Sequence, residues 1–417
     1  MASANQNTGT RKLKIAIFSG AIPSTTFIEH LIKNIAKHHT VLLFGTQKRK
    51  VHYNSNSIKI HKTPKPHFSN LLVSSYRVLL LLFTRPSHLI KLVNEIRKYP
   101  KLYDRWVWFT KILPIVLYKP DILHIQWARN MEFYAFLRDA YGIKLMLSLR
   151  GAHINYSPIV DKHLAEVYRK TFPSVDAFHA VSEAIGIEAE KYYADPLKIK
   201  VIHSPISPKF LKAYKVYSKP SRDKIRLLSI GRAHWVKGYH YAVQAISILK
   251  QQGYQIEYTI IGVKEKNEAL SFQINQLGLS QNVHFVSPIP QDELLSKLHE
   301  YDALILSSLK EGIANVVLEA MAVGLPVITT DCGGMNEVVT PLKNGFLTAY
   351  RNPEALAETI VDFLNTSEED LKNITERAHN LIRTEFQSED KINEFLKLYS
   401  SVVSEEDPSN GERNEIP

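Results

Sequence analysis

Two glutamates that stand eight positions apart could bind a polar ligand. Glu311 lies beside Gly312 at the end of a β-like run, and Glu319 lies in "EGIANVVLEAM" (311–321), whose Ala-, Val- and Leu-rich pattern is typical of a helix. A carboxylate that is buried without a partner costs several kcal/mol. Two carboxylates near a helix start suit sugar hydroxyls, which donate hydrogen bonds. The alternative is a capping glutamate followed by an exposed helical one.

The segment "GRAHWVKG" (231–238) combines the residue types that bind a diphosphate, and a helix is predicted over 237–252. Gly231 allows a close backbone turn. Arg232 and Lys237 add two cations to a helix N-terminus, where backbone N–H groups already favour anions. We expect both cations to be exposed in the empty protein. The alternative is a pair of solvated basic residues in a loop. The segment is not a Walker loop, because no "GKS" or "GKT" follows.

The elements that must position these residues alternate between strand and helix signals along the whole chain. Short β-rich runs separated by helical segments indicate parallel strands with crossover helices. In open parallel sheets ligands bind outside the carboxyl ends of the strands, and both Gly231 and Glu311 follow such runs. The pattern predicts an α/β protein with two Rossmann-like, doubly wound parallel-sheet domains.

The domain boundaries follow from length and composition. A chain of 417 residues exceeds what one core usually serves, so two domains of ~200 residues each are expected. We expect a first domain over 1–205, a proline-rich linker over 206–222 and a second domain over 223–384. A C-terminal helix over 385–403 can pack back on the first domain, and 404–417 reads as a disordered tail.

Charge is distributed unevenly between the two halves. Residues 1–220 hold 34 Lys and Arg against 13 Asp and Glu, a net charge of +21, whereas residues 221–417 hold 18 against 28, a net charge of −10. No acidic residue occurs between Glu29 and Glu95, where eleven Lys or Arg lie. This asymmetry predicts that the first domain faces something anionic.

The remaining composition predicts a cytoplasmic protein. The N-terminal "MASANQNTGTRK" lacks the apolar core of a signal peptide, and no apolar run approaches the ~20 residues of a membrane-spanning helix. Cys332 is the single cysteine, which excludes an internal disulfide and fits a reducing compartment.

One apolar and basic stretch, 70–119, suggests a membrane partner. It contains "NLLVSSYRVLLLLFTRPSHLIKL" (70–92) and "DRWVWFTKILPIVLYK" (104–119). Aromatic and basic residues beside an apolar face are typical of an interfacial helix on anionic lipid, which would make the protein peripheral on the inner face of the membrane. The alternative is that these helices cover the first sheet and are buried.

The combined motifs resemble a known family. "GR" followed by "KG", then "EG" with a second Glu eight positions on, then "CGG..E", is similar to the family 4 glycosyltransferases of GT-B fold over most of 225–365. The resemblance extends more loosely to "PSTTFI" (23–28), "DILHIQWA" (121–128), "SLRGAHI" (148–154) and "AVSEA" (180–184). It implies two domains facing a cleft and retaining transfer of a sugar from a nucleotide diphosphate-sugar to an acceptor hydroxyl, in polysaccharide, lipopolysaccharide or glycolipid synthesis.

The resemblance also implies residue roles. Arg232 and Lys237 would hold the diphosphate and neutralise it as it leaves, and Glu319 would bind the ribose. Glu311 would lie by the hydroxyls of the donor sugar. Backbone groups would support the phosphates and the sugar at Gly20, Gly231, Gly312, Ile313 and Ala314. The chain contains no Asp-x-Asp motif, so neither a metal nor another cofactor is expected.

The first domain departs from the family pattern. Where relatives often have Phe-His-Gly-x-Asp, this chain has "LRGAH", with Arg150 in place of the His and His153 in place of the Asp. The family's histidine role therefore does not transfer to Arg150. His153 could supply an imidazole from the same loop or be a structural residue. Gly20, which ends the first predicted strand, could equally be a plain turn glycine.

Two other classes of function remain as alternatives. The first is a GT-B-fold epimerase or phosphorylase that acts on a related sugar; release of nucleoside diphosphate that depends on an acceptor would separate it from a transferase. The second is a basic nucleic-acid-binding protein. No recognisable nucleic-acid module occurs in the basic half, which has an ordinary α/β pattern, so no nucleic acid partner is expected.

Overall fold

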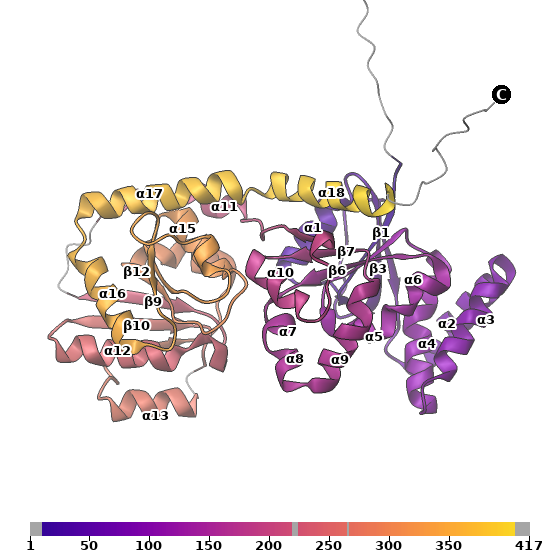
Figure 1. Cartoon of the computed structure of the whole chain (residues 1–417), viewed down its shortest axis with the longest axis horizontal. Coiled ribbons are helices and arrows are strands. Elements are labelled where there is room, and N and C mark those ends of the chain that lie inside the picture. Colours follow the sequence, from indigo (N-terminus) through magenta and orange to yellow (C-terminus); the bar gives the residue numbers. More distant parts are fainter. Residues whose placement is uncertain (1–10, 219–223, 265–266, 405–417) are drawn as a thin grey trace, which may run out of the picture. The chain divides into compact units, whose positions relative to one another are not determined.

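The computed structural model describes residues 11–218, 224–264 and 267–404. The chain divides into two compact units, each with its own parallel sheet (Figure 1). The first unit contains 1–180, 188–200 and 392–417, and the second contains 181–187 and 201–391. The predicted tail lies outside the described residues except for Ser404, which ends the last helix.

The sheet of the first unit has the strand order β2-β3-β1-β5-β6-β7-β8, and β4 also pairs with β3. All neighbouring strands from β2 and β4 through β7 run parallel. Its described strands are β1 Lys14–Phe18, β2 Gly20–Ile22, β3 Thr40–Gln47, β4 Ile58–Lys62, β5 Ile122–Ile125, β6 Lys144–Leu149, β7 Ala177–Ala180 and β8 Ile199–Val201. Central strands such as β5 are buried at every residue, as expected when helices cover both faces of a parallel sheet.

The helices of the first unit connect these strands. They are α1 Thr26–Ile35, α2 His67–Thr84, α3 Pro86–Arg97, α4 Leu102–Tyr118, α5 Met131–Tyr134, α6 Phe136–Tyr141, α7 Gly151–Asn155, α8 Ser157–Val160 and α9 Lys162–Thr171. The next helix, α10 Glu183–Glu190, is divided between the two units, since 181–187 belong to the second. In α1 the aliphatic residues recur at helical spacing, and all four of them are buried: Ile28, Leu31, Ile32 and Ile35. This pattern determines which side of α1 faces the sheet.

The second unit has a six-stranded parallel sheet with the order β11-β10-β9-β12-β13-β14. The strands are β9 Ile225–Ile230, β10 Ile256–Ile261, β11 Val283–Val286, β12 Ala303–Leu306, β13 Val327–Thr330 and β14 Phe346–Thr348. The chain proceeds from β9 to β11 in one direction, and β12 then restarts on the other side of β9. The helices that follow β9 and β12, α12 (Tyr239–Gln251) and α15 (Asn315–Val323), therefore pack on opposite faces of the sheet, and open α/β sheets bind ligands at such a switch point.

Helices cover both faces of the second sheet (Figure 1). They are α11 Pro208–Lys212, α12 Tyr239–Gln251, α13 Glu268–Gln276, α14 Gln291–Lys297, α15 Asn315–Val323, α16 Pro353–Asn365 and α17 Glu368–Glu385. The last helix, α18 Ser388–Ser404, lies mainly in the first unit. One apolar cluster joins α12, α13 and α16 to the sheet, and a second joins α11, α14, α15 and α17 to its other face. The two-domain α/β fold predicted from the alternating pattern is confirmed.

The predicted linker, 206–222, contains residues that belong to the core of the second unit. Phe210 on α11 is fully buried, and Ile206 is 5% exposed. The backbone N–H of Ile206 donates to the carbonyl of Phe386, 3.0 Å away. A proline-rich sequence without a strand pattern was an insufficient sign of a linker, because the short α11 uses its apolar residues for packing. Residues 219–222 lie outside the described residues.

The C-terminal helix α18 packs on the first sheet. Tyr399 is fully buried, and its hydroxyl lies 2.7 Å from Nδ1 of His124 on β5. Nε2 of His124 lies 2.8 Å from the hydroxyl of Ser148, which also contacts His179 at 2.8 Å. Burial, then His179 and Arg150, lower the pKa of His124. His124 is thus a neutral residue of the core.

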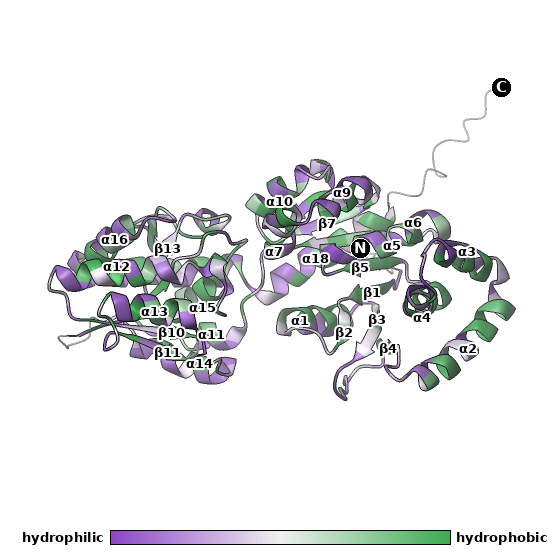
Figure 2. Cartoon of the chain, turned by 90° about the horizontal axis from the view of Figure 1, so that it is seen from below, coloured by the Kyte–Doolittle hydropathy of each residue, from purple (hydrophilic) through white to green (hydrophobic). Residues whose placement is uncertain are grey.

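The stretch 70–119 divides between the two predicted alternatives. The C-terminal half of α4 is buried from Ile112 to Val116, as a helix that covers a sheet should be. Helix α2 turns mostly polar residues inward. Its buried residues are Asn70, Ser74, Arg77 and Leu81, whereas most of its large apolar side chains are exposed. Figure 2 shows hydrophobic residues along this helix. None of the described helices is long and apolar enough to cross a membrane.

Candidate functional site

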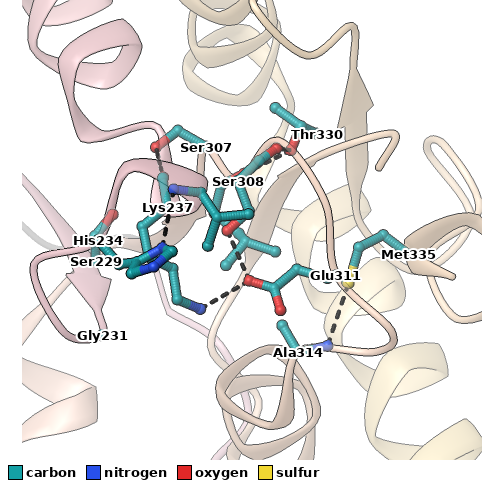
Figure 3. A network of polar contacts seen from close by, with 12 residues as sticks. Ser229, Gly231, His234, Lys237, Ser307, Ser308, Glu311, Ala314, Thr330 and Met335 are labelled. Carbon is teal, nitrogen blue, oxygen red and sulfur yellow. Dashed lines mark hydrogen bonds and ion pairs between the residues drawn. The ribbon is translucent and has the colours of Figure 1, made fainter. Parts of the chain in front are cut away.

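The loops after β9 and β12 meet at the carboxyl edge of the second sheet (Figure 3). β9 and β12 are neighbours, with Leu227 beside Ala303, so both loops leave the sheet at the same place. The N–H of Leu309 donates to the carbonyl of Val236 at 2.7 Å, and the hydroxyl of Ser307 donates to the carbonyl of Lys237 at 3.0 Å. These bonds hold the two predicted motif segments together.

Gly238 makes this close approach possible. Its φ is +60°, a left-handed conformation, and a Cβ there would lie 2.1 Å from the carbonyl oxygen of Ser307. Any other residue would therefore separate the two loops. At Gly231 a Cβ would lie 2.9 Å from the hydroxyl of Tyr239 and 3.0 Å from Cε of Lys237. The glycine thus leaves room for the lysine side chain.

Lys237 and Glu311 form an ion pair across the two loops (Figure 3). Nζ of Lys237 donates to Oε1 of Glu311 at 2.8 Å, and the side chains are 18% and 17% exposed. The hydroxyl of Ser308 donates to the same oxygen at 2.8 Å. Thr330, at the end of β13, in turn donates to the carbonyl of Ser308 at 2.6 Å. The expectation that Lys237 is exposed is therefore wrong, because its side chain forms a partly buried ion pair with Glu311.

Arg232 is exposed, as predicted, and has no ion pair with any described residue. Nearby, Nδ1 of His234 accepts the N–H of Val236 at 3.3 Å. Burial lowers the pKa of His234, and the charges of Arg232 and Lys237 lower it further. A neutral imidazole can accept this hydrogen bond, whereas an imidazolium cannot. The loop thus presents two cations, one fixed and one at the surface.

Gly312, Ile313 and Ala314 immediately precede α15, which begins at Asn315. The backbone N–H groups of Gly312 and Ile313 donate to no acceptor among the described residues, and that of Ala314 contacts Sδ of Met335 at 3.4 Å. Amides at the start of a helix favour anions. The turn therefore offers donors on the side of the site opposite to the Lys237 loop.

Glu319 lies inside α15 and is only 9% exposed, so it is not a surface residue. Its Oε1 accepts a hydrogen bond from Nε2 of Gln291, at the start of α14, at 2.6 Å. Burial raises the pKa of Glu319, and the hydrogen bond from Gln291 and the charge of Lys209 only partly oppose this effect. The carboxylate is thus partly paired and retains capacity to accept further hydrogen bonds.

The two remaining predicted residues, Gly20 and His153, lie in the first unit. β1 ends at Phe18, so Gly20 does not end the first strand but opens β2, with φ +80°. The ring of His153, on α7, lies 5.5 Å from that of Trp127, and its Nδ1 has no hydrogen-bond partner among the described residues. Burial, then Arg129, lower the pKa of His153.

Sequence reasoning missed several supporting residues. Gln291 and Ser308 bind the two glutamates, yet neither belongs to a motif with a spacing that marks it. Glu337 is the glutamate of the "CGG..E" motif, but its contacts are not indicated by the motif: it accepts the N–H groups of Glu183 and Ala184 at 2.9 Å each. Burial raises its pKa, but His203 and these two bonds outweigh burial and hold the pKa below its usual value. Among the described residues no group of three or more His, Cys, Asp or Glu could hold a metal ion.

The chain is a two-domain α/β protein whose second sheet places Lys237, Glu311 and the turn before α15 at one edge. Residues 213–381 match the family described as glycosyl transferases group 1. The amylovoran biosynthesis glycosyltransferase AmsK of Erwinia amylovora is 32% identical over 258 residues, which are 58% of this chain and 60% of that protein. The match thus spans less than two thirds of this relative.

Solved structures share the fold over nearly the whole chain. The sucrose-phosphate synthase of Thermosynechococcus elongatus has a TM-score of 0.72 at 16% identity and covers 95% of this chain and 100% of its own. The Anabaena HepE protein in complex with UDP has a TM-score of 0.64 at 17% identity, covering 94% and 100%. Over residues 213–381 the chain is thus similar to the glycosyl transferases group 1 family, and its fold is GT-B.

Proposed function

We propose that the protein is a retaining glycosyltransferase that moves a sugar from a nucleotide diphosphate-sugar to an acceptor hydroxyl. The observation that carries this proposal is the ion pair between Lys237 and Glu311, 2.8 Å long, at the point where the strand order reverses. Exposed Arg232 and the unpaired amides of Gly312 and Ile313 lie on the loops that this pair joins. The match of residues 213–381 to the glycosyl transferases group 1 family supports the proposal.

The reaction needs stabilisation of charge on the leaving group. The bond between the anomeric carbon and the diphosphate oxygen breaks, and the diphosphate keeps the electron pair. The acceptor oxygen forms the new glycosidic bond, and its proton passes to the released diphosphate or to water. Cations and amides that are already aimed at the diphosphate lower the barrier most effectively, because they do not reorganise during the step. Arg232, Lys237 and the α15 amides take this role without a metal.

The two glutamates bind the ends of the donor. Glu319, with Gln291 holding one oxygen, accepts the ribose hydroxyls. Glu311 fixes Lys237 with one oxygen, and its other oxygen is left for the hydroxyls of the donor sugar. Gly20 and Gly231 allow close backbone approach to the donor. Because the HepE structure contains UDP, UDP-sugars are the first donors to test.

His153 is the candidate for a direct role in the first unit. Its lowered pKa leaves the imidazole neutral at pH 7, a state that can accept a hydrogen bond from the acceptor hydroxyl.

The deciding experiment measures nucleoside diphosphate release with and without acceptors, after a screen of nucleotide-sugars for thermal stabilisation. A ligand at 100 times its dissociation constant adds ~2.7 kcal/mol to stability. Release that requires an acceptor hydroxyl supports a transferase. Interconversion of sugars without an acceptor, or cleavage that requires inorganic phosphate, would instead indicate an epimerase or a phosphorylase.

We also propose that the acceptor is lipid-linked, or another intermediate of polysaccharide, lipopolysaccharide or glycolipid synthesis, and that the protein works at the inner face of the membrane. The supporting feature is the α2 face, defined by the exposed side chains of Phe68, Leu71, Leu72, Tyr76, Leu79, Leu82 and Phe83, which are 46–84% exposed. Soluble proteins rarely expose so many large apolar side chains on one helix without a partner.

The basic residues near α2 support an anionic lipid surface as that partner. Helix α2 carries no acidic residue. Exposed basic residues flank it: Lys65 before it, Arg85 directly after it and Lys91 on the following α3. Each Lys or Arg near an anionic membrane contributes about 1 kcal/mol. The buried side of α2 is fixed by polar contacts, since Asn70 donates to Thr110 on α4 and Arg77 donates to the carbonyl of Lys62. The apolar side chains are thus held outward.

A further inference from the structure

Arg150 is a largely enclosed cation without a carboxylate partner. It directly follows β6, whereas Gln126 follows the neighbouring strand β5. Because the carboxyl ends of parallel strands meet at one edge, the two side chains lie together, and a guanidinium N–H of Arg150 reaches Oε1 of Gln126 at 3.3 Å. No ion pair joins Arg150 to any described Asp or Glu, and its Nε donates to no described acceptor.

Unpaired polar groups are concentrated around this edge. Ten buried side-chain nitrogen or oxygen atoms lack a hydrogen-bond partner among the described residues, and five of them belong to four residues of 126–155. They are Nε2 of Gln126, Nε of Arg150, Nδ1 of His153 and both amide atoms of Asn155. Gln126 is fully buried and Asn155 is 5% exposed. Buried polar groups are normally satisfied, so such a concentration needs an explanation.

The structure compensates the charge of Arg150 only weakly. Its guanidinium carbon lies 4.2 Å from the centre of the Phe27 ring, a cation–π contact. Burial lowers the pKa of Arg150 to about 9, which indicates how unfavourable the charged state is at this place. A cation that is enclosed without a counter-ion destabilises the fold, and residues of this kind are typical of binding sites. An incoming anion would remove the imbalance.

We propose that Arg150 and Gln126 bind an anionic group of the acceptor, a carboxylate or a phosphate. This inference rests on the proposed transferase function and adds the chemical class of the acceptor. The planar guanidinium fork matches both groups, and the Gln126 amide offers a further N–H. Phe27 and Trp127, whose rings lie 6.3 Å apart, provide an apolar surface beside the charged group.

Binding of simple acidic sugars to the whole protein tests the proposal without turnover. The probes are glucuronic acid for the carboxylate, glucose 6-phosphate for the phosphate and glucose as the neutral match, each titrated by calorimetry. At least one acidic sugar should bind ~10-fold or more tightly than glucose, and Arg150→Gln should weaken that sugar ~10-fold or more while leaving glucose unchanged. Tighter binding of glucuronic acid indicates a carboxylate, and tighter binding of glucose 6-phosphate indicates a phosphate.

A matched variant controls for general charge. Arg85→Gln removes one exposed positive charge from the same unit, and it should leave the affinity for the acidic sugar within ~2-fold. Arg150→Gln should also melt no lower than the wild type, because it removes an uncompensated charge. Equal binding of acidic and neutral sugars, or unchanged acidic-sugar affinity in Arg150→Gln, would overturn the proposal.

A second variant decides the case if Arg150→Gln does not fold. Arg150→Lys keeps the charge but lacks the fork, so it should bind the acidic sugar several-fold more weakly; an unchanged affinity overturns the assignment to Arg150. The proposed function can fail separately. A protein that binds an acidic sugar through Arg150 but releases no nucleoside diphosphate contradicts the transferase proposal alone. Transfer to neutral acceptors without acidic-sugar binding contradicts this inference alone.

Discussion

The ammonium group of Lys237 lies 2.8 Å from a carboxylate oxygen of Glu311, 74 positions further along the chain. An ammonium has three N–H donors, so this bond fixes the lysine and leaves the others for phosphate oxygens. The hydroxyl of Ser308 shares the same carboxylate oxygen. The residues proposed as the diphosphate cation and the sugar-binding carboxylate, which the motifs suggested separately, thus form one hydrogen-bonded group.

Lys237→Ala should lower turnover by ~10²-fold or more, because it removes a fixed cation from the leaving diphosphate. Its melting temperature should also fall, since Glu311 loses its counter-ion in a site where both side chains are less than a fifth exposed. Steady-state kinetics and thermal denaturation measure the two effects. The control is Lys372→Ala, which breaks an exposed ion pair with Glu368 on α17 and should change neither quantity appreciably.

The pairing predicts strong coupling between the two residues. In the double variant Lys237→Ala, Glu311→Gln, turnover should fall by much less than the product of the two single-variant losses, because each residue positions the other. Multiplicative losses in this double-mutant cycle would show that the two act independently.

The sequence predicts the alternation of strands and helices, the two sheets and the convergence of the β9 and β12 loops, because these depend on local periodicity and on the geometry of parallel sheets. It does not predict that α2 turns Asn70, Ser74 and Arg77 inward. Their partners, Thr110 and the carbonyl of Lys62, are distant in the chain or belong to the backbone. The Lys237–Glu311 pair was missed for the same reason.

Activity should survive EDTA, since Arg232, Lys237 and the α15 amides are proposed to neutralise the diphosphate themselves. Initial rates with and without chelator check this, and a metal-dependent glycosyltransferase treated in parallel serves as the positive control. A complete loss of activity that only Mg²⁺ or Mn²⁺ restores would require a different donor site.

Stability should depend on the ionisation of Glu319. Burial raises its pKa in the folded protein, so the folded state binds more protons than the unfolded state once the pH exceeds the ordinary value of about 4.3. Stability from this group is therefore present at low pH and is lost as the pH rises through the folded pKa. The melting temperature of Glu319→Gln relative to the wild type should rise between pH 4 and pH 7. A difference that is constant over this range would contradict the expected shift.

The α2 face should bind anionic vesicles. Sedimentation with phosphatidylglycerol vesicles should recover the wild type, and with phosphatidylcholine vesicles much less, because the basic residues require anionic headgroups. The triple variant Phe68→Ser, Leu72→Ser, Phe83→Ser should lose most of this binding. Phe272→Ser, which removes a side chain 68% exposed on α13, is the matched control. If the triple variant instead dissociates an oligomer and binds vesicles normally, the face pairs copies of this chain.

Substitutions of Glu311 and Glu319 should have different effects, because the two residues are proposed to bind opposite ends of one nucleotide-sugar. Glu319 lies inside α15, whereas Glu311 lies in the preceding turn. Eight residues of regular helix would span ~12 Å. The separation is shorter because Glu311 lies in the turn, and we expect it to remain on the scale of a donor's sugar-to-ribose distance. Glu319→Gln should weaken both the donor and free nucleoside diphosphate, since both contain the ribose. Glu311→Gln should largely spare nucleoside diphosphate affinity and lower turnover or donor discrimination.

Titration of nucleoside diphosphate against both variants by calorimetry decides the matter, with Glu358→Gln on α16 as a control that should match the wild type. Equal losses of affinity in the two variants, or none in either, would show that the eight-residue spacing has another cause.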